Sequence, residues 1–179
     1  MVYTLLADGF EEIEALTVVD ILRRAGIEVK MASADETMIV EGAHGIAVKA
    51  DCAVSDAEVS DVLFLPGGMP GVTNLEKNPK VIALIEQYEK DENAYIAAIC
   101  AAPKILGEMG LLNEKHATCY PGFESCLKGA SVLEDAVVQE DRIITSRGAG
   151  TAAELAFHLV TLLKDEQTAE KLRSGMIYA

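Results

Sequence analysis

Short apolar runs alternate along this chain with segments of helical spacing, and that alternation limits the fold more than any other feature. The apolar runs have no polar side, as residues 62–65 show, and so predict strands buried on both faces. The segments between them have the spacing of amphipathic helices. Because parallel strands of this kind need helices above and below the sheet, the sequence predicts an α/β fold. We expect a three-layer sandwich with a mostly parallel sheet and helices on both faces.

The expected elements follow one another from end to end. Strands are predicted at residues 2–7, 27–33, 62–65, 94–99, 116–120, 132–139 and 142–145, with a hairpin formed by 37–40 and 45–48. Helices are predicted at 11–25, 79–90, 101–109, 151–164 and 165–174, with one short turn at 55–58. Capping boxes are expected for Asp8 with Glu11 and for Thr151 with Glu154, and Asn78 is expected to cap the helix that begins at Pro79.

Composition limits the partners and the setting. No linker or repeat divides the 179 residues, so a single domain spanning 1–179 is expected. A net charge of −14 argues against nucleic acid and membrane surfaces as partners. The first residues lack the pattern of a signal peptide, and no apolar run is long enough to span a bilayer. Four cysteines without zinc-like spacing suit a reducing cytoplasm and predict no metal site: Cys52, Cys100, Cys119 and Cys126.

Cys100 lies where an expected strand meets an expected helix. Apolar residues precede it and small residues follow it, which is the pattern of a nucleophile elbow. Backbone N–H groups and the helix dipole favour a thiolate at such a turn, so we expect an acidic, reactive thiol. The alternative is an inert core cysteine, since most free cysteines are buried.

Two further segments are expected to end at the same edge of the sheet as Cys100. Ligands in open α/β sheets bind beyond the carboxyl ends of the strands, so residues 7–14 and 65–71 join the candidate site. The N–H groups of Gly68 and Ala101 are candidates for binding developing negative charge, although a Gly-Gly pair is also common in plain turns.

Three glutamates crowd the start of the first expected helix. Two of Glu11, Glu12 and Glu14 are expected to face solvent and favour the helix dipole. The third is expected to point along the edge of the sheet.

Five motifs in order resemble those of the ThiJ/PfpI family, in the branch of the deglycase associated with Parkinson disease. They are residues 9–14, 23–26, 65–68, 97–103 and 145–151. The resemblance implies a flavodoxin-like sandwich, usually dimeric, with cysteine chemistry that needs no cofactor. It also implies that Cys100 is the nucleophile, that Glu14 hydrogen-bonds its sulfur, and that Gly68 and Ala101 are the oxyanion donors. The remaining implied residues border the pocket (Gly67, Tyr120, Ser146, Arg147) or lie toward the dimer partner (Arg24, His44).

Several positions depart from the family pattern. Tyr120 stands where the deglycase branch has a histidine, and a phenol is a poorer base than imidazole at neutral pH. His44 stands in place of an arginine that reaches across the dimer. Ala101 stands where the protease-like branch has a histidine, and no His-x-Glu pair of the amidotransferases is present. Peptidase and amidotransferase activities are therefore disfavoured.

Two functions remain open at this stage. The first is a glyoxalase- or deglycase-type enzyme acting on small α-oxoaldehydes or glycated amines. The second is a redox-responsive stress protein or chaperone that senses oxidation through Cys100. In both cases the partner is a small reactive carbonyl or an oxidant, and we expect a homodimer around Ile13, Thr17 and Arg24, with Ile13 and Leu16 on the core stripe of the first helix.

Overall fold

The computed structural model describes residues 1–178, so that Ala179, the last residue of the expected domain, lies outside the described residues. Seven strands form the main sheet in the order β10-β11-β7-β6-β1-β2-β5. All neighbouring pairs are parallel except β10 with β11, so the prediction of a mostly parallel sheet is confirmed. The strands are β1 Val2–Leu6, β2 Val29–Ser33, β5 Cys52–Ala53, β6 Val62–Leu65, β7 Tyr95–Ile99, β10 Val137–Glu140 and β11 Ile143–Ser146.

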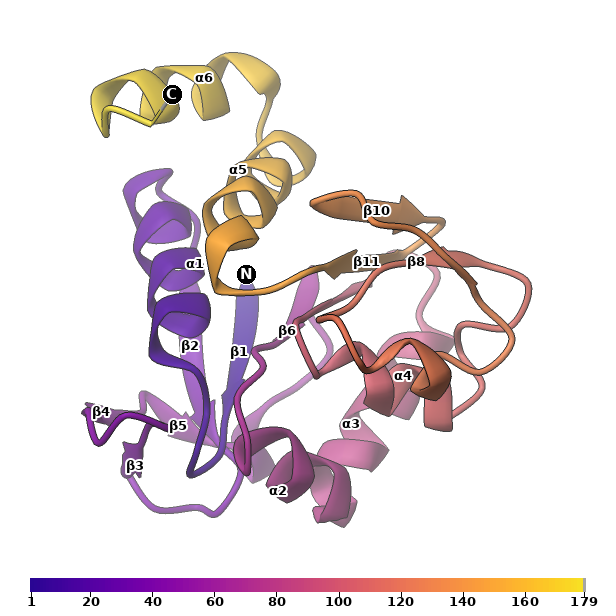
Figure 1. Ribbon diagram of the computed structural model, residues 1–179. Helices are drawn as coiled ribbons and strands as arrows, with labels where there is room; N and C mark the ends of the chain where they lie inside the picture. Colours follow the sequence, from indigo (N-terminus) through magenta and orange to yellow (C-terminus); the bar gives the residue numbers. More distant parts are fainter. Residues whose placement is uncertain (179) are drawn as a thin grey trace.

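Helices cover both faces of this sheet, as expected. Helices α1 (Glu12–Arg24) and α5 (Ala152–Leu163) pack against each other on one face, and α6 (Glu166–Gly175) lies against α5 (Figure 1). The other face is covered by α2 (Gly71–Lys77), α3 (Pro79–Lys90) and α4 (Pro103–Glu108). The described residues also contain three single-turn helices: η1 Val54–Asp56, η2 Glu124–Cys126 and η3 Ala149–Thr151.

A hydrophobic core lies on each face of the sheet, and alternate side chains of each strand contribute to one core or the other. In β1, Leu6 faces the core under α1 and α5, whereas Leu5 faces the core under α3 and α4. In β6, Phe64 and Leu63 divide between the two cores in the same way. Successive side chains of a strand point to opposite faces, so a strand covered on both sides must be apolar throughout.

Helix α1 begins differently from the sequence prediction. Its N-cap is Glu11, whose carboxylate accepts the N–H of Glu14 at 2.7 Å, so the expected Asp8–Glu11 capping box is wrong. Asp8 instead accepts the N–H of Glu41 at 2.9 Å. The core stripe also differs, because Ile13 is 57% exposed. The buried apolar residues of α1 are Ala15, Val18, Val19, Ile21 and Leu22.

Two short elements in the first half differ in how well they were predicted. The expected hairpin is present as β3 (Ile39–Glu41) and β4 (Ala47–Lys49), paired antiparallel. Helix α2 was not predicted, because its start at Gly71 follows a run rich in glycine and proline that is typical of a turn.

The segment after α4 is less regular than predicted. Only two residues of the expected strand 116–120 belong to a strand, as β8 (His116–Ala117), which pairs with β9 (Ser131–Val132) outside the main sheet. The expected strand 132–139 is accordingly divided between β9 and β10. The chain turns after β8, and the N–H of Tyr120 donates to the carbonyl of Cys100 at 2.8 Å.

The expected Thr151–Glu154 capping box does not form. The Thr151 hydroxyl donates instead to the carbonyl of Gly148 at 2.9 Å. The cap at Asn78 is confirmed, since its side chain accepts the N–H of Lys80. Within residues 1–178, no helix is both long enough and apolar enough to cross a lipid bilayer.

Candidate active site

Three loops meet at the carboxyl edge of the sheet because β1, β6 and β7 are neighbours and run parallel. The N–H of Glu11 donates to the carbonyl of Gly67 at 2.9 Å, and that of Gly71 to the carbonyl of Gly9 at 3.1 Å. A Cβ atom on Gly68 would lie 2.4 Å from the Glu11 nitrogen. The two backbones therefore touch, and only glycine fits at this contact.

Cys100 occupies the turn directly after β7. Its φ of +65° lies in the left-handed region, which a residue with a side chain rarely adopts. Two segments hold it there, since its N–H donates to the carbonyl of Ser146 at 2.9 Å and its own carbonyl accepts from Tyr120. This is the geometry of a nucleophile elbow, in which a sharp turn after a strand presents the side chain above the edge of the sheet.

The sulfur of Cys100 is surrounded by hydrogen-bonding groups. The backbone N–H groups of Ala101 and Gly68 point to it, and the Glu14 carboxyl group lies against it. Within residues 1–178, neither of these N–H groups donates to a backbone carbonyl. Both donors are therefore free to stabilise negative charge on sulfur or on an oxygen bound next to it.

Glu14 is fully buried behind the thiol. Its Oε2 accepts the N–H of Gly67 at 2.8 Å. A Cβ atom on Gly67 would lie 2.6 Å from this oxygen and 2.6 Å from the Cβ of Cys100. Gly67 is thus the residue that allows the carboxyl group and the thiol to meet.

Burial changes the ionisation of both groups. It raises the pKa of Glu14 to about 7, against the hydrogen bonds from Cys100 and Gly67. Burial also raises the pKa of Cys100 to about 12, and the neighbouring Glu14 carboxylate adds to this rise, whereas the N–H groups of Ala101 and Gly68 oppose it. The expectation of an acidic thiol is therefore wrong, because burial and the Glu14 carboxylate outweigh the backbone donors and raise the pKa of Cys100 above that of an ordinary thiol. One proton is shared by the pair between these two values, and the titration belongs to both groups.

The other two glutamates correct a further expectation. Glu12 is buried as well as Glu14, so only Glu11 has substantial contact with water. The carboxylate of Glu12 accepts the backbone N–H of His44 at 2.7 Å, and its Oε2 lies 2.7 Å from Nδ1 of the same residue. His44 is thus bound to its own chain. Burial tends to raise the pKa of Glu12, but the hydrogen bonds from His44 outweigh burial and hold it below its usual range.

The residues expected to border the pocket occupy different depths. Tyr120 is 50% exposed, and its ring lies 3.2 Å from where a Cβ of Gly148 would be. Ser146 is fully buried, and its hydroxyl donates to the carbonyl of Ala136 at 2.7 Å, so it ties the end of β11 to the residue that precedes β10. Arg147 donates to the carbonyl of Glu134 at 3.1 Å. Arg24, expected to lie toward a dimer partner, pairs with Asp20 on the exposed face of α1 at 2.7 Å.

With this geometry established, comparison with known proteins places the chain. Residues 1–162 match the DJ-1/PfpI family. The chain belongs to the DJ-1/PfpI family. This confirms the family predicted from the five sequence motifs.

Relatives with this fold come from distant organisms. DJ-1 homolog B of Arabidopsis thaliana is 38% identical over 176 residues, which are 96% of this chain and 40% of that protein, so the chain spans well under half of that relative. The glutathione-independent glyoxalase DJR-1.2 of Caenorhabditis elegans is 34% identical, covering 94% of this chain and 91% of that protein. The structure of oxidized DJ-1 from Toxoplasma gondii has a TM-score of 0.92 at 36% identity, covering 99% of this chain and 98% of that one. The flavodoxin-like fold is thereby confirmed.

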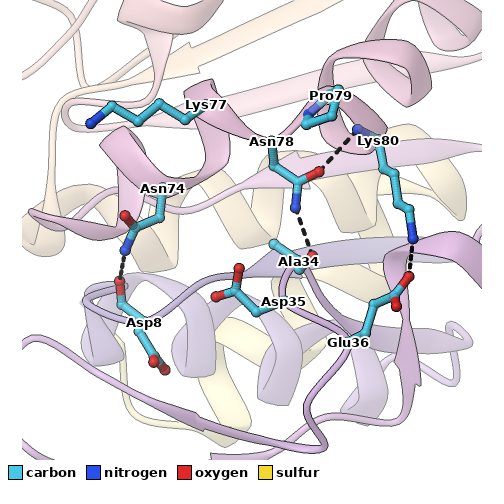
Figure 2. A pocket seen from close by; sticks show the side chains of 9 residues that line it. All are labelled: Asp8, Ala34, Asp35, Glu36, Asn74, Lys77, Asn78, Pro79 and Lys80. Atoms are coloured by element: carbon cyan, nitrogen blue, oxygen red, sulfur yellow. Dashed lines mark hydrogen bonds and ion pairs between the residues drawn. The ribbon is translucent and has the colours of Figure 1, made fainter.

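A groove of about 560 Å³ lies at the carboxyl ends of β1 and β2, but it contains none of the residues around Cys100 (Figure 2). Its polar groups are largely paired with one another. Asn74 donates to the carbonyl of Asp8 at 2.8 Å, Asn78 donates to that of Ala34 at 2.7 Å, and Lys80 pairs with Glu36 (Figure 2). In this member of the DJ-1/PfpI family the groove lies between the strand ends and the helices α2 and α3.

The remaining cysteines have settings that differ from the elbow. Cys119 is buried, and burial raises its pKa to about 11. Burial also raises the pKa of Cys52. Of the cysteines in this DJ-1/PfpI protein, all of which lie in the described residues, Cys100 is the one with a positive φ.

Proposed function

We propose that this chain is a cofactor-independent glyoxalase- or deglycase-type enzyme that uses Cys100 to attack small α-oxoaldehydes or glycated amines. The observation that carries the proposal is the sulfur held between the N–H groups of Gly68 and Ala101 and the carboxyl group of Glu14. A relative covering 94% of the chain carries the name glutathione-independent glyoxalase, which supports the same chemistry.

The proposed reaction begins when Glu14 takes the proton that it shares with Cys100 and the sulfur attacks the aldehyde carbon. A carbon–sulfur bond forms, and the electron pair of the carbonyl moves to oxygen, where Gly68 and Ala101 donate hydrogen bonds. Glu14 protonates this oxygen to give a hemithioacetal. It then moves the proton from the first carbon to the second through an enediol, which leaves a thioester. Water hydrolyses the thioester, so the net change is the addition of one water to give a 2-hydroxy acid and the free thiol.

A shared proton suits Glu14 to both proton transfers. A carboxyl group with a pKa of about 7 gives and accepts protons near neutral pH, which is where general acid–base catalysis is most effective. Tyr120 contributes a hydrogen-bond donor at the mouth of the site in place of the family's histidine, and Glu14 is therefore the base in this mechanism.

The decisive experiment measures loss of methylglyoxal and formation of lactate by the purified protein. We expect turnover in the wild type and none in Cys100→Ser. Cys52→Ser is the matched control and should retain turnover, because Cys52 lies in β5 at the far edge of the sheet. Absence of turnover in the wild type, or turnover that survives in Cys100→Ser, would refute the proposed activity.

A second candidate function is redox sensing through the same thiol. A sulfinate formed from the thiolate and two molecules of peroxide, with release of two waters, has oxygens that the same N–H groups and protonated Glu14 can bind. The related Toxoplasma gondii structure is of an oxidized protein, which favours this candidate. If Cys100 gains two oxygens readily but methylglyoxal is not consumed, sensing in a reducing cytoplasm is the better assignment.

Homodimer formation on α1 is also part of this proposal. Ile13 is 57% exposed at the start of α1, and Ile46 is 52% exposed in the β3–β4 hairpin, which is bonded to the same helix through Glu12 and His44. Exposed apolar residues of this kind favour contact with another chain.

A further inference from the structure

A second cluster of side chains lies beside α1, apart from Cys100 and unused by the proposed mechanism. Glu11 and Glu12 from the start of α1 and His44 from the β3–β4 hairpin each offer one ligand atom, and these atoms all lie within 4.8 Å of one another. We propose that Glu11, Glu12 and His44 bind a divalent transition-metal ion, with Zn²⁺ as the best match. Imidazole nitrogen and carboxylate oxygen are both zinc ligands in proteins, and three such ligands leave the fourth position for water.

The distances suit a single ion. Ligand atoms on a tetrahedral zinc ion lie roughly 3.4 Å apart, given zinc–nitrogen and zinc–oxygen bonds of about 2.1 Å. Nδ1 of His44 and Oε2 of Glu12 are 2.7 Å apart, and since no separation in the group exceeds 4.8 Å, the widest one needs to shorten by at most about 1.4 Å. In the single chain the His44 side chain is 69% exposed and Glu11 is half-buried, so water can reach the site and complete the shell. Oε2 of Glu11 accepts the N–H of Glu14, so its other carboxylate oxygen is the one available to an ion.

The backbone holds the fixed part of the site in place. Glu12 is only 5% exposed, and its carboxylate occupies the space beside Gly42, where a Cβ atom would lie 2.3 Å from Oε1. The N–H of Ala43 donates to the carbonyl of Phe10 at 2.8 Å, which ties the hairpin to the start of α1. A buried carboxylate with a fixed orientation lowers the cost of ordering the ligands.

Among the described residues, a second histidine–glutamate pair lacks a third metal-ligating side chain nearby. Nδ1 of His116 lies 2.8 Å from Oε2 of Glu140, almost the same contact as in the His44 pair. Within residues 1–178, however, the group of Glu11, Glu12 and His44 is the one with three suitable donors close together. His116 is therefore a matched control for a histidine that is paired but lacks a third ligand.

The site also has a favourable charge. Two carboxylates and a neutral imidazole carry a charge of about −2, which a divalent ion neutralises, and binding requires His44 to give up any proton on Nδ1. The chain as a whole carries −14, which attracts cations to its surface.

The test is titration of the purified protein with Zn²⁺ by calorimetry and with Co²⁺ by visible absorption, in a Cys100→Ser background that removes a competing thiolate. We expect one ion per chain, bound without a thiolate-to-cobalt charge-transfer band. His44→Ala and Glu11→Gln should each weaken binding at least about tenfold, because losing a ligand costs no less than losing an outer-shell partner. His116→Ala should bind as the parent does. Both substituted ligands are accessible to water, so neither change opens a cavity in the core.

Thermal unfolding supplies an independent readout. Zn²⁺ should raise the unfolding temperature of the parent and of His116→Ala but not of His44→Ala. Equal binding by His44→Ala and the parent, or a cobalt spectrum showing thiolate ligation, would overturn the proposal. Because none of these measurements uses methylglyoxal, they succeed or fail independently of the proposed enzymatic activity.

Discussion

Glu14→Gln is expected to remove a pH dependence of stability that the buried carboxyl group imposes. The pKa of Glu14 rises from 4.5 to about 7 in the folded protein because of burial. Below the lower value the group is protonated in both states. Between the two values the unfolded chain releases this proton while the folded protein keeps it, so the wild type loses stability as pH rises. The loss is complete above the folded pKa.

The size of this effect follows from the shift. A rise of about 2.5 pKa units corresponds to about 3 kcal/mol at 1.36 kcal/mol per unit. Glutamine has no proton to release, yet its amide still offers a donor to Cys100 and an acceptor to Gly67. The free energy of unfolding of Glu14→Gln minus that of the wild type should therefore rise by about 3 kcal/mol between about pH 4 and about pH 8.

Urea denaturation across this range measures the difference directly. The same two proteins in a Cys100→Ser background show whether burial or the neighbouring thiol raises the pKa of Glu14. If burial dominates, most of the pH-dependent difference in unfolding free energy should remain without the thiol. A difference that stays flat with pH would mean that Glu14 ionises in the folded protein as it does in the unfolded chain. The buried carboxyl–thiol pair, and the mechanism built on it, would then be refuted.

Three further outcomes are expected. Gly67→Ala should abolish turnover and destabilise the fold by about 1–3 kcal/mol, because the added Cβ would overlap Glu14 and Cys100. Gly150→Ala is the control and should do neither, because the space around Gly150 is open. Equal effects of the two variants on activity would contradict this steric argument. Brief treatment with substoichiometric iodoacetamide should label Cys100 first by mass spectrometry, and preferential labelling of another cysteine would contradict the elbow. Light scattering should give twice the chain mass of 19.1 kDa, and Ile13→Glu should halve it; a monomeric wild type would count against the dimer.

The features predicted well from the sequence are those with a local cause. Strands such as β6 are apolar throughout because both faces of the sheet are covered, and that pattern is visible without the fold. The cap at Asn78 is equally local, because the residue and the N–H that it binds are two positions apart. The position of Cys100 at the end of β7 follows from the same kind of pattern.

The features missed depend on distant parts of the chain. Glu12 has the sequence setting of a solvated first-turn glutamate, and its burial depends on His44, 32 residues away, and on the space left by Gly42. The shortness of β8 has a similar cause. The chain leaves the strand direction there to reach Cys100, whose carbonyl binds the N–H of Tyr120. Contacts between residues so far apart leave no periodic pattern in the sequence, so they could not be predicted from it.

The glycine contact between the β1–α1 and β6–α2 loops also decides where this protein can change its length. Surface loops ordinarily accept inserted residues. Here Gly9 and Gly71 leave no room, since a Cβ on Gly9 would already lie 2.4 Å from Pro70, and any added residue would separate Gly68 from the sulfur. The segment from Tyr120 to Ala136 has no such restriction at its exposed turns. New substrate preferences in engineered or diverged forms should therefore enter through insertions in that segment, while the two glycine loops keep a constant length.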